Sequence, residues 1–261
     1  MPTVHVNGIE IYYQEHGYGY PVILTHGLGD CAELWSPLAE ALALPGKGYR
    51  VIGWDMRGHY RSEAPEDLAQ YTQDIVVEDL RALCDHLGIE RAVHGGHSLG
   101  GYTALRFHEK YPQRVAALVL HGTGPGYRNP EGSQAWTDQL AKLADWQERN
   151  FERADRKPAK ELRVGAPALG QVGQHLVRGV AGVERGIMAH PYFIDATKVD
   201  VPALLIVGEN DKNYLASAEY FTAKLPNAKK LVVAGAGHPA ILEQPEAVHA
   251  AVREFLDGLD L

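Results

Sequence analysis

The apolar residues of this chain fall into short runs that fit the strands of a sheet. Near the N-terminus they alternate with polar residues on both sides of Asn7-Gly8, a dipeptide that tolerates the positive φ angles of a tight turn, so residues 4–13 predict a β-hairpin. Unbroken apolar runs follow, of the kind found in strands that a parallel sheet buries on both faces. These runs lie at residues 21–24, 50–53, 91–93, 115–120, 203–207 and 230–233.

Segments with the periodicity of helices lie between several of these runs. Residues 71–87 carry apolar side chains at helical spacing, and residues 99–111 end before Pro112, which cannot continue a helix. A stripe near the C-terminus predicts a last helix and consists of Val248, Val252, Phe255 and Leu259. The alternation of strands and helices favours an α/β fold built on a doubly wound, mostly parallel sheet.

The alternation stops between residues 126 and 198. Gly, Pro, Arg and Asn cluster at the start of this segment, a helix-like stretch covers 134–151, and no strand-like run follows within it. Apolar residues three and four positions apart are expected to share one face of that stretch, namely Trp136, Leu140, Leu143 and Trp146. We interpret 126–198 as a helical cap inserted late in the sheet of an α/β core that comprises 1–125 and 199–261.

Composition narrows the class of protein. The length of 261 residues suits one α/β domain with an insertion, and the net charge of −8, without a run of Lys or Arg, disfavours nucleic acid and anionic membranes as partners. No apolar stretch approaches the roughly 18 residues of a membrane span, and the N-terminal residues lack the basic start and apolar core of a signal peptide. The two cysteines, Cys31 and Cys84, fit reduced thiols, so we expect a cytoplasmic protein.

The pattern Gly96-His97-Ser98-Leu99-Gly100 follows a strand-like run and opens a predicted helix. A serine at such a turn projects its hydroxyl away from the sheet, and small residues two positions before and after it let the flanking backbones pass. The start of the helix adds free N–H groups and partial positive charge where an oxyanion forms. We therefore predict Ser98 as a nucleophile, with His97 as a wall or supporting residue of the site.

Two backbone amides are predicted to form an oxyanion hole. One belongs to Leu99, directly after the nucleophile, and the other to Leu28, in the loop after an earlier strand. Glycines on both sides of Leu28 allow its N–H to turn inward. We interpret the neighbouring His26 as a histidine that braces this loop through hydrogen bonds to the backbone, in preference to an acid–base role.

His238 is the candidate general base, because it lies in a loop between the last strand-like run and the last helix, at the sheet edge where ligands bind. Its imidazole needs a carboxylate that fixes the tautomer and stabilises the charged form. Asp211, after the run at 203–207, is the predicted acid, with Glu209 as the alternative. The order along the chain is therefore Ser, acid, His.

Other polar residues near strand ends receive no catalytic role. Asp55 also ends a strand-like run, and we interpret Asp55 and Arg57 as a pair that stabilises the turn. The chain contains no HExxH or CxxC pattern, so no metal and no organic cofactor is expected.

Together these motifs resemble the α/β-hydrolase superfamily, in particular its capped members related to esterases and enol-lactonases. The resemblance implies the fold and a Ser-acid-His triad. Ser98 disfavours the epoxide hydrolases and haloalkane dehalogenases of this superfamily, which carry an Asp nucleophile, and Pro239 disfavours the ring-fission hydrolases, which often carry Trp after the histidine. The matching segments are HGLGD at 26–30, DMRGHYRS at 55–62, GHSLGG at 96–101, GEND at 208–211 and GAGHPAILEQPEAV at 235–248.

The expected function is hydrolysis of small to medium, partly apolar carboxylic esters through an acyl-enzyme on Ser98, with a small-molecule ester as the partner. The alternatives are a carbon–carbon bond hydrolase, an amidase or a thioesterase on the same triad, and a ligand sensor with a capped pocket. We expect the pocket under the cap, although the cap stripe alternatively serves only to pack the cap onto the sheet. The predicted wall residues are His97, Trp136, Leu140, Leu143, Trp146, Met188, Tyr192 and Ile241.

Overall fold

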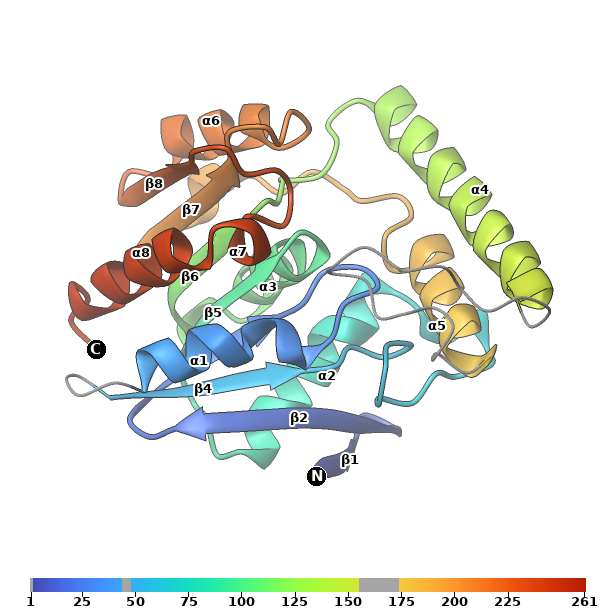
Figure 1. Cartoon of the computed structure of the whole chain (residues 1–261), viewed down its shortest axis with the longest axis horizontal. Helices are drawn as coiled ribbons and strands as arrows, with labels where there is room; N and C mark the ends of the chain where they lie inside the picture. The colour runs from blue at the N-terminus through green and yellow to red at the C-terminus, as the bar shows by residue number, and fades with distance from the viewer. Residues whose placement is uncertain (1, 44–47, 155–173) are drawn as a thin grey trace.

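The computed structural model describes residues 2–43, 48–154 and 174–261 and contains a sheet of eight strands with helices on both faces (Figure 1). The second strand runs antiparallel to both of its neighbours, whereas all other pairings are parallel. The predicted doubly wound, mostly parallel sheet is therefore confirmed. In spatial order the strands are β1 (Thr3–Val6), β2 (Ile9–Gly17), β4 (Tyr49–Trp54), β3 (Tyr20–Thr25), β5 (Ala92–His97), β6 (Val115–His121), β7 (Ala203–Gly208) and β8 (Ala228–Val233).

Burial along the strands follows their place in the sheet. The central strands β5, β6 and β7 are buried at every residue, as their unbroken apolar runs predict. The first hairpin is also confirmed, because Asn7 and Gly8 have φ angles of 48° and 80° between β1 and β2. The expectation that the run at 230–233 is buried on both faces is wrong: β8 is an edge strand, and its Val232 is 42% exposed.

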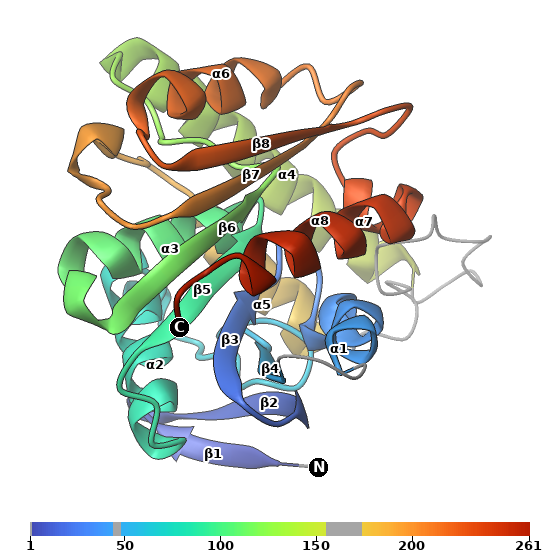
Figure 2. The ribbon, with the colours of Figure 1, turned by 90° about the vertical axis from the view of Figure 1, so that its left-hand side faces the viewer.

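Helices cover the two faces of the sheet in two groups (Figure 2). One hydrophobic cluster joins the sheet to α2, α3 and α6, and a second joins it to α1, α7 and α8. The bounds are α1 (Ser36–Leu42), α2 (Gln73–His86), α3 (Leu99–Lys110), α6 (Leu215–Lys224), α7 (Ala240–Glu243) and α8 (Pro245–Asp257), with 3-10 turns η1 (Ala32–Trp35), η2 (Leu68–Gln70), η3 (Pro112–Arg114) and η5 (Ala196–Lys198). Among the described residues, no helix has the length and apolar character needed to cross a bilayer.

The predicted helices at 71–87, at 99–111 and near the C-terminus are confirmed as α2, α3 and α8. The Thr72 side chain caps α2 by accepting a hydrogen bond from the Ile75 N–H, and α3 ends at Lys110, just before Pro112. Three further helices, α1, α6 and α7, were not predicted. They have 7, 10 and 4 residues, fewer than the roughly 11 residues over which helical periodicity can be recognised.

Between β6 and β7 the described residues form α4 (Pro130–Ala154), which covers the predicted helix at 134–151, and α5 (Gln174–Arg185). The two helices are joined by the Arg185 guanidinium, which lies 2.7 Å from the Glu148 carboxylate. Helix α5 packs closely on the core, because a Cβ added at Gly179 would lie 2.8 Å from the Cα of Gly58. Residues 155–173 of the predicted cap lie outside the described residues, and the division into core and cap stays a prediction.

Candidate active site

Ser98 occupies a strained turn between β5 and α3. Its φ of 53° and ψ of −113° lie outside the regions that residues with a side chain usually adopt. The Ser98 N–H donates to the carbonyl oxygen of His121 at 2.9 Å, and the Thr123 hydroxyl donates to the carbonyl oxygen of Ser98 at 2.8 Å. The end of the neighbouring strand β6 therefore holds the strained backbone, and the half-buried serine lies at the carboxyl end of β5.

The glycines on either side of Ser98 let this turn pack against β3. A Cβ added at Gly96 would lie 2.5 Å from the carbonyl oxygen of Thr25, and one added at Gly100 would lie 2.6 Å from the carbonyl oxygen of His26. Both distances are far below a normal contact between carbon and oxygen. The G-x-S-x-G spacing thus follows from the close approach of two backbones at the end of the sheet.

His238 and Asp211 form the pair of imidazole and carboxylate that the sequence predicts. The His238 Nδ1 lies 2.8 Å from the Asp211 Oδ2, so the Nδ1–H donates to the carboxylate. Asp211 follows β7 and is buried, whereas His238 lies in the loop between β8 and α7 with 37% of its side chain exposed. This hydrogen bond leaves Nε2 as the acceptor nitrogen, which is the form that a general base needs.

Glu209, the alternative acid, has a different partner. Its carboxylate accepts a hydrogen bond from the Gly235 N–H at 2.9 Å and so ties the loop after β7 to the turn after β8. Among the described residues, Asp211 is the carboxylate that the structure brings to the His238 ring.

Ser98 and His238 share a neighbour, Tyr214, which the sequence analysis did not single out. The Tyr214 ring stacks on the His238 imidazole, with centroids 4.8 Å apart and planes at 16°. Burial raises the pKa of Tyr214, and a hydrogen bond with the Ser98 hydroxyl opposes that rise. Among the described residues no direct hydrogen bond joins Ser98 to His238, and in apo active sites such bonds are often long and tighten only around a ligand. Tyr214 lies three residues after Asp211, directly before α6, and no motif in the sequence points to it.

The amides of Leu28 and Leu99 are the predicted donors of an oxyanion hole. Leu99 is the first residue of α3, so its N–H has no acceptor within the helix. Leu28 follows β3 in a loop that turns at Gly29, where φ is 75°. Neither N–H has a hydrogen-bond acceptor in the part of the chain that the structure describes. The two predicted donors are therefore free to bind an oxygen atom of a ligand.

His26 braces the Leu28 loop, as predicted. Its Nδ1–H donates to the Gly27 carbonyl oxygen at 2.7 Å, and its Nε2 accepts a hydrogen bond from the Met56 N–H at 3.0 Å. Burial lowers the pKa of His26 to about 4, so the ring is neutral at pH 7. Because the backbone uses both ring nitrogens, His26 has none left for acid–base work on a substrate.

His97 is buried and packs against His238. The residue is 5% exposed, and its ring centroid lies 4.6 Å from that of His238 and 4.8 Å from that of His121. Its Nε2–H donates to the His238 carbonyl oxygen at 3.2 Å, and its Nδ1 lies 3.8 Å from the Asp30 carboxylate. The prediction of a wall residue stays a prediction. The alternative, a supporting residue, fits these contacts.

The predicted pairing of Asp55 with Arg57 is also wrong, since each residue has another partner. Arg57 forms a buried ion pair with Asp79, at 2.6 Å from Nε and 2.7 Å from Nη2. Asp55 binds the Nε of Arg61 at 3.0 Å and the N–H of Ala32 at 2.6 Å. Both residues are structural, as expected, but they hold segments that are distant along the chain.

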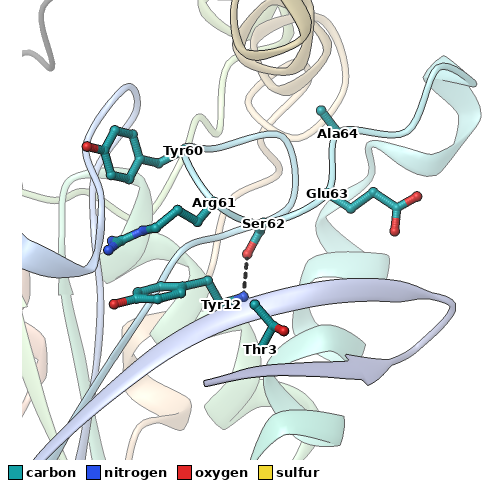
Figure 3. Close-up of a pocket in the computed structure, with 7 residues that line it drawn as sticks. All are labelled: Thr3, Tyr12, Tyr60, Arg61, Ser62, Glu63 and Ala64. Carbon is teal, nitrogen blue, oxygen red and sulfur yellow. Dashed lines mark hydrogen bonds between the residues drawn. The ribbon is translucent and has the colours of Figure 1, made fainter. Parts of the chain in front are cut away.

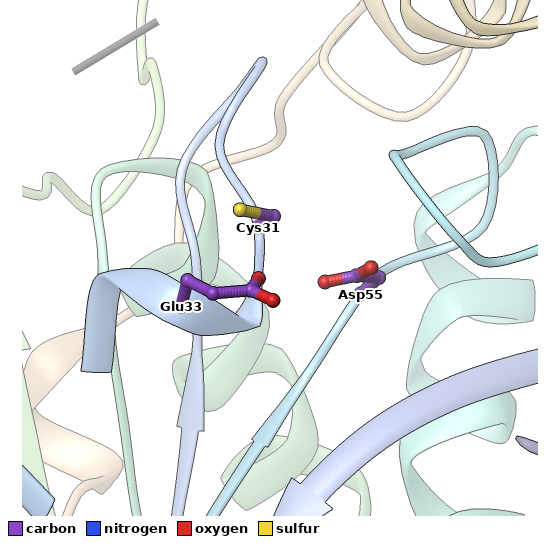
Figure 4. A group of neighbouring side chains, drawn as sticks. All are labelled: Cys31, Glu33 and Asp55. Carbon is purple, nitrogen blue, oxygen red and sulfur yellow. The ribbon is translucent and has the colours of Figure 1, made fainter. Parts of the chain in front are cut away.

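Cys31, Glu33 and Asp55 are the one set of candidate metal ligands among the described residues (Figure 4). Their ligand atoms lie within 4.8 Å of one another. The Arg61 guanidinium already forms ion pairs with the carboxylates of Glu33 and Asp55. Arg61 therefore balances the negative charge of Glu33 and Asp55, the role that a metal ion would otherwise have at these carboxylates.

The predicted wall residues on α4 divide into two groups. Leu140 is buried, and the Trp136 indole N–H donates to the carbonyl oxygen of Met188 at 3.1 Å. Leu143 and Trp146 are 37% and 54% exposed, so the expectation that all four residues share one face is wrong. Three residues of an α-helix turn by about 300°, so each three-residue step moves the side chain about 60° away from the face of Leu140.

Tyr192 and Ile241, also predicted as pocket walls, make other contacts. The Tyr192 ring lies under the Arg106 guanidinium at 3.8 Å, and its hydroxyl donates to Glu109. Ile241 is 3% exposed and belongs to the hydrophobic cluster with α1 and α8. Tyr192 therefore connects the insertion to α3 through Arg106 and Glu109, and Ile241 packs α7 against the hydrophobic core.

A groove of about 590 Å³ contains none of the predicted site residues (Figure 3). The Arg61 guanidinium lies 3.5 Å from the ring centroid of Tyr12, and the Tyr12 N–H donates to the Ser62 hydroxyl at 3.0 Å. These contacts hold the loop after β4 against β2. The lining residues are Thr3, Tyr12, Tyr60, Arg61, Ser62, Glu63 and Ala64.

Comparisons with known proteins agree with this architecture. Residues 20–163 match the family model of the alpha/beta hydrolase fold, and residues 188–260 match a model described as TAP-like protein. The chain is 28% identical to a putative 2-succinyl-6-hydroxy-2,4-cyclohexadiene-1-carboxylate synthase of Bacillus subtilis (strain 168), across 91% of this chain and 90% of that protein.

Two solved structures are similar over nearly the whole chain. One is a thermophilic esterase from Thermogutta terrifontis, with 29% identity, a TM-score of 0.78 and coverage of 97% of this chain and 96% of that one. The other is the enol-lactonase from Burkholderia xenovorans LB400, with 26% identity, a TM-score of 0.76 and coverage of 98% and 99%. Because the first family model covers more than half of the chain and the sheet has the matching architecture, the protein belongs to the α/β-hydrolase fold family and is a hydrolase.

Proposed function

We propose that the protein is a serine hydrolase that cleaves carboxylic esters of small to medium, partly apolar substrates, lactones included. The observation that carries the proposal is the hydrogen bond of 2.8 Å between His238 and Asp211. Both residues lie beyond the carboxyl ends of parallel strands, as does Ser98 in its strained turn. The similarity to an esterase and an enol-lactonase supports the same class of substrate.

In the proposed reaction, Ser98 Oγ attacks the ester carbonyl carbon while its proton moves to Nε2 of His238. Asp211 accepts the Nδ1–H hydrogen bond and stabilises the imidazolium that forms. The N–H groups of Leu28 and Leu99 bind the oxyanion of the tetrahedral intermediate. The intermediate collapses with loss of the alcohol, which takes the proton from His238, and the acyl group stays on Ser98.

Water then repeats the sequence on the acyl-enzyme. His238 removes a proton from water, the hydroxide adds to the acyl carbon, and Ser98 Oγ leaves with the proton that His238 returns. Each oxyanion donor contributes most when charge has moved onto the carbonyl oxygen, so the loss of one donor costs roughly 100- to 1000-fold in rate.

The insertion supplies the proposed cap over this site. Trp136 and Met188 are joined by a hydrogen bond, and Trp136 lies 6.1 Å from Tyr127, measured between ring centroids. We propose that these side chains, with Leu140 behind them, bound the acyl or alcohol pocket. A wall of this kind favours partly apolar substrates, because it offers aromatic surface and few charges.

Hydrolysis of p-nitrophenyl acetate and butyrate tests the proposal. We expect turnover in the wild-type protein and none above background in Ser98→Ala, with the melting temperatures of the two proteins nearly equal. A phosphonate should add to Ser98 once per chain, as read by intact mass and peptide mapping. Surviving turnover in Ser98→Ala would remove Ser98 from the mechanism.

A substrate panel separates the ester proposal from the other reactions that the same three residues can carry. Ring-fission dienones, amides and thioesters should give kcat/KM values below those of matched esters. A higher value for one of them would assign the protein to that reaction. Absence of turnover with all four, combined with tight binding of an ester analogue, would favour a ligand sensor.

A further inference from the structure

Tyr214 covers the imidazole that the proposed mechanism uses. The centroids of the Tyr214 and His238 rings lie 4.8 Å apart, and their planes are inclined by 16°, so the rings are close to parallel. The Asp211 hydrogen bond holds the Nδ1 edge of the imidazole but leaves its plane free to tilt about that bond. A stacked aromatic ring removes this freedom, because tilting the imidazole would open the contact.

Tyr214 and Asp211 belong to the same backbone turn after β7. The Tyr214 N–H donates to the carbonyl oxygen of Asp211 at 3.1 Å, and the Leu215 N–H donates to the same oxygen at 3.1 Å. One backbone turn therefore sets both the carboxylate and the aromatic ring relative to His238. Gly124 also lies close to Tyr214, because an added Cβ would come within 3.7 Å of ring carbon Cε1.

The hydroxyl of Tyr214 reaches the second reacting group. It interacts with the Ser98 hydroxyl, and burial raises the pKa of the phenol, so the group stays protonated through the neutral range. In this contact the Ser98 hydroxyl donates to the phenol oxygen, which is why it lowers the pKa of Tyr214. When the serine proton turns to Nε2 of His238, the neutral phenol can instead donate a hydrogen bond to Ser98 Oγ. As the serine proton moves to His238, negative charge develops on Oγ, and a donor at this position stabilises it while keeping its own proton.

We propose that Tyr214 is a positioning residue of the site, with its ring holding the plane of the His238 imidazole and its hydroxyl holding Ser98 Oγ and stabilising the charge that develops there. The role rests on the proposed serine hydrolysis. Tyr214 acts both when Oγ attacks the ester and when Oγ leaves the acyl-enzyme, because charge passes through the same atom in both steps.

The variant Tyr214→Phe keeps the ring and removes only the hydroxyl. Diethyl p-nitrophenyl phosphate is the probe, because it adds to a nucleophilic serine and releases one p-nitrophenol without turnover. We expect its second-order rate to fall about tenfold in Tyr214→Phe, the effect of one lost hydrogen bond to developing charge. With p-nitrophenyl butyrate, kcat should fall by a similar factor while KM stays within about twofold. Tyr214→Leu, which also lacks the stacked ring, should lose a further factor of about ten.

Tyr220→Phe is the matched control, since it removes a hydroxyl from α6, the helix that directly follows Tyr214. The Tyr220 ring packs against Phe193, with centroids 5.4 Å apart. This control variant should react with the phosphate at the wild-type rate. Wild-type rates in Tyr214→Phe would overturn the proposed role, and so would a rise in KM with kcat unchanged. Failure of the wild-type protein to form the phosphate adduct on Ser98 would instead overturn the serine mechanism itself, so the two failures are distinguishable.

Discussion

The Nε2 of His97 lies 3.2 Å from the carbonyl oxygen of His238, so the residue before Ser98 holds the loop that carries His238. The same ring faces the Asp30 carboxylate in the Leu28 loop, with Nδ1 at 3.8 Å. His97 thereby lies between the two loops that the proposed mechanism needs, and Gly27 leaves space for it, because a Cβ there would lie 2.8 Å from the His97 Nδ1.

Replacing His97 should therefore slow turnover without weakening substrate binding. We expect kcat for p-nitrophenyl butyrate to fall about tenfold or more in His97→Ala, because the His238 loop loses its hydrogen bond and small displacements of a catalytic group are costly. His97→Gln keeps a side-chain donor and should recover part of the rate. Equal rates in wild type, His97→Ala and His97→Gln would show that the contact has no role in positioning.

The buried pair of Arg57 and Asp79 gives a prediction for stability. Their side chains are 1% and 0% exposed, so removal of one partner leaves a charge without water or a counter-ion. We expect Asp79→Ala to lower the free energy of unfolding by about 3–5 kcal/mol, measured by urea denaturation. The double variant Arg57→Met/Asp79→Leu removes both charges and should recover most of the loss. A double variant less stable than Asp79→Ala would contradict this account.

The parts of the site that sequence predicts well are those fixed by short-range geometry. Ser98, Asp211 and His238 each follow a strand of the parallel sheet, and the carboxyl ends of parallel strands lie on the same side of a sheet. The structure brings Asp211 and His238 into contact, and the role of Ser98 with them stays a proposal. The brace at His26 is local in the same sense, since one of its partners is the next residue.

Interactions that depend on packing between distant segments could not be predicted in this way. Arg57 has a nearby carboxylate in Asp55, but it pairs with Asp79 on α2, because the helix docks on the turn and buries both groups. Trp146 fits an apolar stripe by spacing, yet the face that α4 buries is set by α5 and the core. Tyr214 carries no motif, and its stacking on His238 emerges only when α6 is placed beside β7.

Buried neutral histidines should make the protein sensitive to mild acid. His94, on β5, is 1% exposed and stacks on Phe107 with centroids 4.4 Å apart. Burial lowers its pKa in the folded state from 6.5 to about 3. Between these two values the unfolded chain binds a proton that the folded chain does not, so stability is full above pH 6.5 and falls as the pH decreases below it.

The variant His94→Leu tests this linkage. At pH 5 the His94 contribution alone corresponds to about 2 kcal/mol of lost stability relative to neutral pH. The difference in unfolding free energy between pH 7.5 and pH 5 should therefore be smaller by about that amount in His94→Leu than in wild type, measured by urea denaturation at both pH values. An identical difference in the two proteins would show that His94 is not a source of the acid sensitivity.

The two tryptophans of α4 give a matched test of the proposed pocket. Trp136 packs against Tyr127, with ring centroids 6.1 Å apart, and its indole N–H donates to the carbonyl oxygen of Met188. We expect Trp136→Ala to raise KM for p-nitrophenyl butyrate severalfold while kcat changes less, because substrate loses a contact made equally in the ground and transition states. Trp146→Ala, on a side chain that is 54% exposed, should leave both constants within about twofold of wild type. If Trp146→Ala raises KM and Trp136→Ala does not, the pocket lies on the other side of α4 and the proposed wall is wrong.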